Sequence, residues 1–231
     1  MQTAMNTKVI PLDGQTHLDF ANWPRRSAFD FFRAFDIPSF NVCTKIDVTR
    51  LKRAVKEVGN GTLSLAYHFI AIRLANEIAP FRYRLDGERV LVHAQVHGST
   101  TVLRADESLG FATLEYQPDF GHFAALGASS LALAGQSKVP LEPSKHGTAT
   151  IHLTTLPWIH FSSYSNARQW GPNDSIPKIA FGRIDNDGGR CWMPLSVEVH
   201  HALMDGLHVG QFIEAFESAV QDPLAILTTT R

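Results

Sequence analysis

An alternating run followed at once by a helical pattern constrains the fold of this chain most. Residues 39–47 alternate between apolar and polar side chains, which indicates a β-strand. Residues 48–58 then repeat apolar side chains at helical spacing, and Gly59 is suited to end that helix. A second, more apolar helix is expected at 63–78. A strand joined to two helices in this way predicts a fold in which helices pack on a sheet.

The rest of the chain continues to mix strand and helix patterns. Asp86-Gly87 lies between two alternating runs in residues 81–96 and predicts a hairpin turn. Residues 111–116 are either a connection or a short strand. Further strands are expected at 16–20, 100–104, 148–156, 176–184 and 192–199, and helices at 119–134 and 207–220. Because the chain has no internal repeat and no long linker, we expect one α/β domain over residues 1–231.

The composition excludes several classes of function. The formal net charge is −1, so the chain has no basic field to attract nucleic acid or an anionic membrane. It contains no run of about 18 apolar residues, and its first residues lack the apolar region of a signal peptide. The two cysteines, Cys43 and Cys191, are unlike a disulfide scaffold or a multi-cysteine zinc site. We therefore expect a cytoplasmic protein.

Three imidazoles and one carboxylate fall within His200–His208, between the last predicted strand and the last predicted helix. Histidine titrates near neutral pH and is the usual proton carrier in catalysis, although this stretch can equally be a strand end with solvated or hydrogen-bonded histidines. If the alternation of Leu195, Val197 and Val199 continues, His201 points to the apolar side. We then expect His201 to be the less exposed of the histidine pair and to act as a neutral base.

Asp205 lies four residues after His201 and directly before the last predicted helix. It can cap that helix, pair with a cation or orient His201, and its distance from His201 in the sequence is compatible with all three roles. A zinc site built from His200, His201, Asp205 and His208 is a competing interpretation. Adjacent strand residues point to opposite faces, so His200 and His201 should not converge on one ion, and we expect no metal. The chain contains no Gly-x-Ser-x-Gly elbow and no glycine-rich phosphate loop.

An aromatic cluster follows Trp23-Pro24 near the start of the chain. Pro24 suits the first turn of a helix, and Phe29, Phe32 and Phe35 are spaced to share one helix face. These rings form either part of the core or the wall of a ligand pocket.

The stretch from Val199 to Val209 closely resembles the active-site signature of the chloramphenicol acetyltransferases, His-His-x-x-x-Asp-Gly-Phe-His-Val. The shorter His-x-x-x-Asp-Gly core also marks dihydrolipoyl acyltransferases, so the choice between the two families depends on the rest of the chain. Four other segments resemble the family in order and spacing, at Asn22–Arg26, Thr44–Asp47, Leu156–Trp158 and Pro194–Val197. The resemblance covers nearly the whole chain.

This resemblance implies a two-layer α/β sandwich with a mixed β-sheet covered by helices, assembled as a homotrimer with active sites at subunit interfaces. It implies acetyl-CoA as acyl donor and a small-molecule hydroxyl as acceptor, which for this family is chloramphenicol, an antibiotic inactivated by the transfer. His201 is then the general base, which takes the proton of the acceptor hydroxyl. Asp205 is structural in the family and pairs with Arg25.

The sequence departs from the family pattern near the reacting groups. Thr154 takes the place of a serine that hydrogen-bonds the developing oxyanion, and it keeps the hydroxyl. Ala180 replaces a threonine of the following strand, so one hydroxyl is missing. Arg183 is the expected contact for a CoA phosphate. Lys178 is a second candidate, although a solvated strand edge is its simpler interpretation.

The expected acceptor contacts are Phe32, which replaces a tyrosine, and Phe111 and Tyr164. Beyond Tyr164, Asn166 and Arg168 stand where the family has apolar residues, and a neutral antibiotic would not need a cation there. Two other functions therefore stay open. One is a dihydrolipoyl acyltransferase core, although these 231 residues contain no lipoyl-lysine segment. The other is a catalytically weak or silent trimeric binding protein, for which Thr154 and Ala180 leave room.

Overall fold

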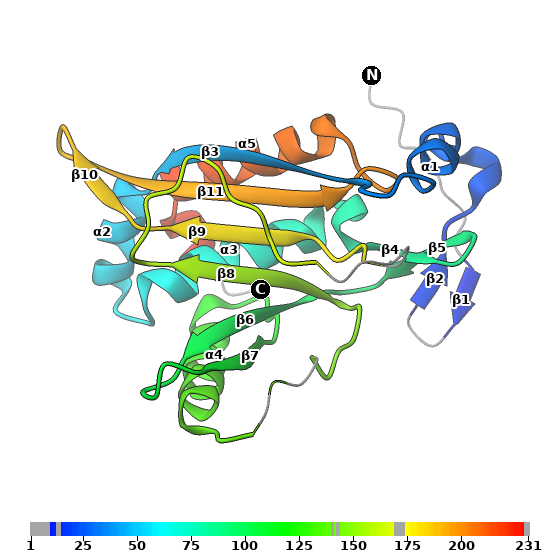
Figure 1. The fold of residues 1–231 in the computed structure, drawn as a ribbon. Coiled ribbons are helices and arrows are strands. Elements are labelled where there is room, and N and C mark those ends of the chain that lie inside the picture. The colour runs from blue at the N-terminus through cyan, green and yellow to red at the C-terminus, as the bar shows by residue number, and fades with distance from the viewer. Residues whose placement is uncertain (1–9, 13–14, 140, 142–143, 169–173, 229–231) are drawn as a thin grey trace.

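The computed structural model describes residues 10–12, 15–139, 141, 144–168 and 174–228. The described chain is built around a mixed sheet of seven strands with helices over one face (Figure 1). The strands are β3 (Ser39–Asp47), β6 (His97–Leu103), β7 (Leu109–Leu114), β8 (Thr150–Leu156), β9 (Lys178–Gly182), β10 (Asp185–Asp187) and β11 (Arg190–His200). The predicted strand at 39–47 is confirmed at both ends, and residues 109–114 form a strand rather than a connection.

The sheet has β3 at one edge and β7 at the other. Both β3 and β9 pair antiparallel with the same residues of β11, so they lie on opposite sides of it. From β9 the order continues through β8 and β6, which run parallel to it, and β7 closes the sheet antiparallel to β6. The predicted mixed sheet covered by helices is therefore confirmed.

The helices form a layer behind this sheet, with α3 at its centre (Figure 1). Ten residues of α3 are buried, which explains why its sequence is apolar on every side. Gly59 ends α2 in a left-handed conformation with φ 70°, as its position predicted. The helices are α1 (Arg26–Phe32), α2 (Thr49–Val58), α3 (Leu63–Glu77), α4 (Phe120–Gln136), α5 (Gly206–Gln221) and α6 (Leu224–Leu227), with 3-10 turns at Phe20–Asn22 and Ala79–Arg82.

A smaller antiparallel sheet lies beside α1 at one end of the molecule (Figure 1). The predicted hairpin is present, but its two-residue loop is Gly87-Glu88, one position later than predicted, because Asp86 still pairs with Arg89. Gly87 has the positive φ of 56° that the first position of such a loop favours. Its strands, in the order β1-β2-β5-β4, are β1 (Ile10–Leu12), β2 (Gln15–His17), β4 (Tyr83–Asp86) and β5 (Arg89–His93).

Strand β11 has two chemically different faces, and both are buried. Leu195, Val197 and Val199 belong to the hydrophobic core under the helices. Ser196, Glu198 and His200 alternate with them and are at most 4% exposed. The segment between β8 and β9 crosses the face of the sheet opposite the helices (Figure 1). The alternation in this strand therefore separates an apolar interior from a polar interior, and not an interior from solvent.

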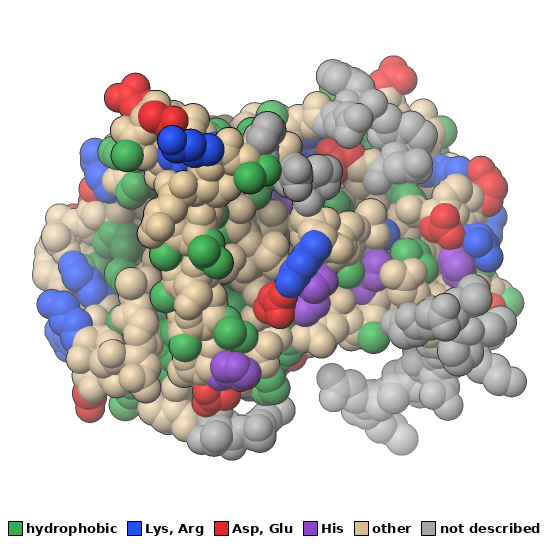
Figure 2. All heavy atoms as spheres, turned by 90° about the horizontal axis from the view of Figure 1, so that it is seen from below, with side chains coloured by type: hydrophobic (Ala, Val, Ile, Leu, Met, Phe, Trp, Pro, Cys, Tyr) green, Lys and Arg blue, Asp and Glu red, His purple; other side chains and the backbone are tan. Residues whose placement is uncertain are grey.

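Charges of both signs are interspersed on the face shown in Figure 2, so no large basic or acidic field covers it. Among the helices of the described residues, none combines the length and the apolar character needed to cross a membrane.

Candidate active site

His201 lies in the turn that follows β11, where backbone and aromatic contacts fix its position. Its N–H donates to the carbonyl of Pro38 at 2.7 Å. Its ring stacks on Phe32 with centroids 3.7 Å apart and planes 5° from parallel, and the Phe40 ring lies 4.7 Å away. The aromatic cluster thus has two roles, because Phe29 is fully buried in the core whereas Phe32 packs against this imidazole.

The prediction that His201 is the less exposed of the pair was wrong. Strand β11 ends at His200, so the alternation does not reach the next residue. His200 is 3% exposed, whereas His201 is only half-buried. Burial, followed by the nearby Arg168 guanidinium, lowers the pKa of His200 to about 4. Its neutral Nδ1 accepts the N–H of Ala202 at 3.2 Å, so His200 shapes the turn.

Arg25 ties the N-terminal region to this turn. Its Nε donates to Asp205 Oδ2 at 3.0 Å, which is the pair that the resemblance implied. Its Nη2 donates to the carbonyl of His201 at 3.0 Å, and its Nη1 to that of Ala202 at 3.2 Å. The guanidinium therefore holds the backbone on both sides of the His201–Ala202 peptide bond.

Asp205 also caps helix α5. Its Oδ1 accepts the N–H of Leu207 at 3.1 Å, and its own N–H donates to His208 Nδ1 at 3.1 Å. Burial alone would raise the pKa of Asp205, but Arg25, His208 and the Leu207 N–H together hold that pKa below its ordinary value. Burial lowers the pKa of His208, which suits a ring that accepts a hydrogen bond. Of the three roles left open for Asp205, it performs capping and cation pairing.

Neither ring nitrogen of His201 hydrogen-bonds to any described residue, and Nδ1 is buried. Asp205 therefore does not orient this ring through a hydrogen bond, unlike the carboxylate of a hydrolase triad. The ring is instead held by its stacking on Phe32 and by the backbone contacts of Pro38 and Arg25.

Thr154 lies on β8, on the polar side of the sheet. Its neighbour Thr155 hydrogen-bonds His68 of α3 at 3.1 Å, so Thr154 faces away from the helices. Its hydroxyl makes no hydrogen bond within the described part of the chain. The sheet register aligns Thr154 with Ala180 and Ala180 with Ser196. Thr154 is therefore level with Ser196, and His201 follows Ser196 by five residues at about 3.3 Å each. Within one chain, Thr154 and His201 are thus about 16 Å apart in the direction of the strands.

The other expected acceptor contacts are also separated within one chain. Phe111 lies on β7, at the edge of the sheet opposite β3, and is 45% exposed. Tyr164 lies in the segment that crosses the sheet, where its carbonyl accepts a hydrogen bond from Asn41 of β3. It lines a cavity of about 470 Å³ that also includes Phe40, the residue packed against His201.

The two basic residues expected near CoA are both engaged in ion pairs. Arg183 is exposed and donates to Asp185 Oδ1 at 2.8 Å and to the carbonyl of Trp158 at 3.2 Å. Lys178 is 5% exposed, and its ammonium lies 2.9 Å from both carboxylate oxygens of Asp174. Its interpretation as a solvated edge was therefore wrong, because β9 lies inside the sheet and the crossing segment covers it.

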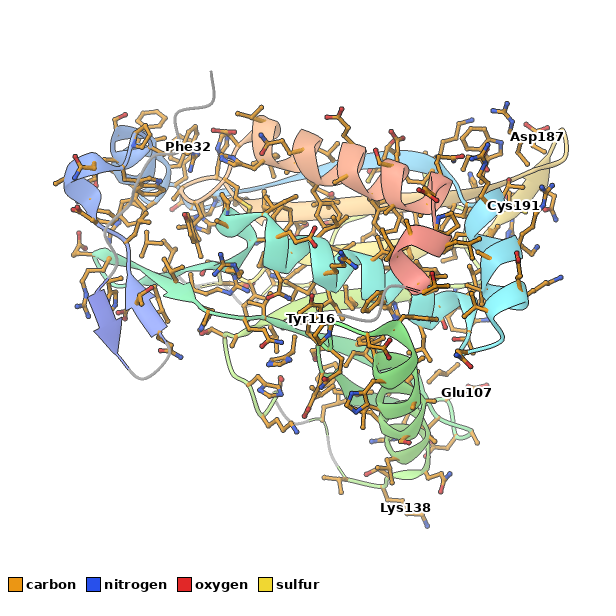
Figure 3. The ribbon with its side chains drawn as sticks, turned by 180° about the vertical axis from the view of Figure 1, so that it is seen from behind. Phe32, Glu107, Tyr116, Lys138, Asp187 and Cys191 are labelled. Atoms are coloured by element: carbon orange, nitrogen blue, oxygen red, sulfur yellow. The ribbon has the colours of Figure 1, made fainter. Side chains whose placement is uncertain are left out.

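A basic cavity of about 560 Å³ that the sequence did not suggest lies where β11 begins. Arg50, Arg53 and Arg190 line it together with Trp192, and its two acidic lining residues, Asp47 and Glu217, leave an excess of one positive charge. Arg53 makes no ion pair with any described residue. Arg50 and Arg53 are three residues apart and share a face of α2, a pattern that resembles an ordinary solvated helix face. Figure 3 shows Cys191 and Asp187 at this end of the molecule and Phe32, which stacks on His201, at the opposite end.

Within the described ranges, no group of three or more His, Cys, Asp or Glu side chains is arranged to hold a metal ion.

Comparisons with known proteins identify the family of this chain. The family model described as chloramphenicol acetyltransferase matches residues 14–217. Chloramphenicol acetyltransferase 2 of Escherichia coli is 28% identical over 205 residues, which is 87% of this chain and 95% of the relative. Chloramphenicol acetyltransferase 3 of Escherichia coli is 26% identical over 214 residues, which is 90% of this chain and 98% of the relative.

Solved structures show the same fold. A chloramphenicol acetyltransferase superposes with a TM-score of 0.76 at 23% identity and covers 87% of this chain and 97% of its own. A dihydrolipoamide acetyltransferase of Azotobacter vinelandii superposes with a TM-score of 0.64 at 17% identity, covering 87% and 88%. The family resemblance inferred from the sequence is thus confirmed. Because the family model spans most of the chain, this protein belongs to the chloramphenicol acetyltransferase family of acyltransferases.

Proposed function

We propose that this protein is an acetyl-CoA-dependent O-acetyltransferase that acts on a hydroxyl of a small molecule, with His201 as the general base. The observation that carries the proposal is the setting of His201. Arg25, Pro38 and Phe32 hold it in place, while both ring nitrogens are left without a partner among the described residues. A residue held in this way is prepared to accept a proton from a bound molecule.

In the proposed reaction, His201 removes the proton of the acceptor hydroxyl as its oxygen attacks the thioester carbonyl of acetyl-CoA. The hydroxyl of Thr154, which makes no other hydrogen bond within the described chain, donates to the oxygen that becomes negative. The carbon–sulfur bond then breaks, and the protonated imidazole returns its proton to the departing thiolate. The products are an acetyl ester and free CoA, and the enzyme regains its starting state.

We further propose a homotrimer in which each site combines His201 of one copy with Thr154 of another. A base and an oxyanion donor must both lie within about 3 Å of the reacting atoms, whereas these two residues are about 16 Å apart along the strands of one chain. Large exposed apolar side chains near His201 and on the far edge of the sheet support such contacts. They are Phe31, Phe35, Ile37 and Leu207 at one place and Leu103, Leu109 and Phe111 at the other.

The same arrangement supports the assignment of substrate contacts. Phe32 would contribute from the copy that supplies His201, and Phe111 from the copy that supplies Thr154. We propose Arg183 and the arginines of the basic cavity as contacts for the CoA phosphates, because phosphate binds strongly to arginine. Arg53 is the best placed of them, since it has no ion pair with a described residue.

Release of thiol from acetyl-CoA, followed with a panel of hydroxyl acceptors that includes chloramphenicol, tests the proposal. His201→Ala should lower kcat by about 10²–10⁴-fold, because general-base catalysis contributes about that much. His17→Ala is the matched control, since this histidine pairs with Asp86 in the small sheet. The control should keep wild-type activity.

Equal thiol release by the wild type and His201→Ala would contradict the proposal. If neither binds CoA in a thermal-shift titration, the silent binding protein becomes the better account. The complete burial of Ala180, a strand residue without a hydroxyl beside Thr154, is the observation that favours that alternative. Acetylation of free dihydrolipoamide would instead favour the dihydrolipoyl acyltransferase.

A further inference from the structure

Strands β6, β7 and β8 carry a polar patch on the sheet face opposite the helices. Ile151 and Leu153 of β8 belong to the hydrophobic core. His152 and Thr154 alternate with them and therefore point to the opposite face. The register pairs His152 with Ser99 of β6. Both of these residues are only half-buried, so a molecule bound on this face can reach them.

The patch adjoins two groups already proposed for the reaction. Ser99 pairs with Thr113 of β7, and Phe111 lies two residues before Thr113. Side chains paired across strands share a face, and so do side chains two residues apart on one strand. His152 precedes Thr154 by two residues, which is about 7 Å along β8. A molecule on this patch would therefore lie between the proposed oxyanion donor and Phe111, a proposed acceptor contact.

The imidazole of His152 makes no hydrogen bond with any described residue. Burial, followed by the Lys178 ammonium, lowers the pKa of His152 to about 4, although Asp174 acts in the opposite direction. The ring is therefore neutral near pH 7. A neutral imidazole has one N–H donor and one acceptor nitrogen, and here both are available to a bound molecule.

The charged residues beside His152 in the sheet are already paired. Lys178, which the register places next to His152, binds both carboxylate oxygens of Asp174 at 2.9 Å. Glu198, which lies next to Lys178 on β11, contacts the Arg168 guanidinium. Lys178 and Glu198 are at most 5% exposed. These two ion pairs add no net charge beside His152 and offer a ligand no free donor or acceptor in its place.

The cost of removing water then determines which chemical group fits against the patch. An apolar group over His152 and Ser99 would displace water without replacing its hydrogen bonds, which is costly. A charged group would find both neighbouring charges of opposite sign already compensated. An uncharged hydroxyl can accept from the imidazole N–H and donate to the Ser99 oxygen, so it replaces the hydrogen bonds of the displaced water.

We propose that the acceptor is an uncharged molecule with a second hydroxyl, and that His152 and Ser99 bind this second hydroxyl. It lies about 7 Å from the hydroxyl that reacts, because Thr154 marks the reacting carbon. This spacing excludes vicinal diols and suits two hydroxyls on opposite sides of a six-membered ring. The proposal rests on the proposed function and narrows its substrate class. His152 and Ser99 are then specificity residues.

Four alcohols built on cyclohexylmethanol test this preference. The parent compound has no second polar group, whereas the other three carry a hydroxyl, a trimethylammonium or a carboxylate at the trans-4 position. Binding by ligand-observed NMR titration and kcat/KM by thiol release are measured for each compound with the wild type. Both should favour the diol over the parent by about tenfold or more, because a site that binds a hydroxyl rejects an analogue without it. The charged compounds should be the poorest, and NMR of the product should show the ester on the primary hydroxyl of the diol.

Variants separate recognition from folding. His152→Phe keeps a planar ring and should remove most of the diol preference, while kcat/KM for the parent alcohol and the KM for acetyl-CoA change by less than about threefold. His152→Gln retains a donor and an acceptor and should keep part of the preference. Ser99→Ala should reduce the preference as well. His122→Phe is the matched control, because His122 is an exposed histidine of α4, and it should keep the wild-type preference.

The outcomes distinguish this inference from the proposed function. Equal use of the diol and the parent, preference for a charged compound, or an unchanged diol preference in His152→Phe would overturn the inference and leave acetyl transfer standing. An equal loss with both alcohols in that variant would overturn it too, since such a loss indicates a structural role, and so would absence of binding by all four compounds. Preferred binding of the diol without thiol release from any acceptor, chloramphenicol included, would support the inference and count against the proposed function.

Discussion

Arg25 is the residue on which the position of His201 depends most. The two lie 176 positions apart in the chain, yet the guanidinium binds the carbonyls of His201 and Ala202 and the carboxylate of Asp205. Arginine suits this place because its planar fork donates to several oxygens at once, which a lysine cannot reproduce. The composition alone would class Arg25 as a solvated charge, and only the family resemblance indicated its partner.

Replacement of Arg25 by alanine should therefore lower both stability and kcat. Loss of three hydrogen bonds from a half-buried site should cost about 2–3 kcal/mol in the free energy of unfolding. The KM for acetyl-CoA should change little, since the proposed CoA contacts lie elsewhere. Urea unfolding and steady-state kinetics measure both effects.

Arg26→Ala is the control for this experiment. Its pair with Asp30 is exposed and joins residues four apart on α1, so its loss should cost less than about 0.5 kcal/mol. Wild-type kcat in Arg25→Ala would show that the guanidinium does not position His201.

Strand β11 shows, at the scale of one element, what the sequence can and cannot predict. The strand, the turn and helix α5 follow from local pattern, because alternation, Asp205 and Gly206 mark their bounds. The burial of Glu198 and His200 does not follow. They are buried because Arg168 and the crossing segment, which lie far from them in sequence, cover the polar face. The misassignment of Lys178 has the same cause.

The candidate active site was likewise only partly predictable from the sequence. The alternation argument that singled out His201 fails, because β11 ends at His200 and His200 is the more buried of the two. The family resemblance names His201 independently, and the Arg25–Asp205 pair that it implied is present in the structure. The basic cavity was missed because helix α2, the beginning of β11 and the end of α5 contribute its residues, and no single stretch of sequence contains the cluster.

His200, the last residue of β11, also makes the stability of the protein depend on pH. His200 has a pKa of about 4 in the folded protein, against an ordinary 6.5, because of burial and of Arg168. In the unfolded chain His200 therefore becomes protonated near pH 6.5, whereas in the folded chain it becomes protonated only near pH 4. Stability from this group is complete above pH 6.5 and decreases as the pH falls toward 4. Between pH 7.5 and 5 the loss should be about 2 kcal/mol from His200.

His200→Asn tests this dependence, since the asparagine oxygen can still accept the Ala202 N–H but does not titrate. Urea unfolding at a fixed protein concentration, at pH 7.5 and at pH 5, should show a smaller difference in the variant than in the wild type. Equal differences in the two proteins would mean that His200 does not contribute.

At the scale of the whole molecule, the groups proposed for one reaction lie at different places in the chain. Phe32, which stacks on His201, lies at one end of the sheet, and the end with Cys191, where the basic cavity lies, is opposite (Figure 3). Phe111 lies on the edge strand β7. A single copy cannot bring His201 and Thr154 to one carbonyl carbon, because about 16 Å along the strands separates them. The central claim is therefore that His201 of one copy and Thr154 of another make one catalytic site.

Mixing two inactive variants tests this claim most directly. His201→Ala and Thr154→Ala are each purified, measured by thiol release, then unfolded together at equal amounts and refolded. If each site draws on two copies, random assembly of trimers places an intact His201 against an intact Thr154 in about one quarter of the sites. The mixture should therefore regain up to about a quarter of the wild-type activity, whereas each variant refolded alone should not. A mixture no more active than the average of the two variants would contradict the claim.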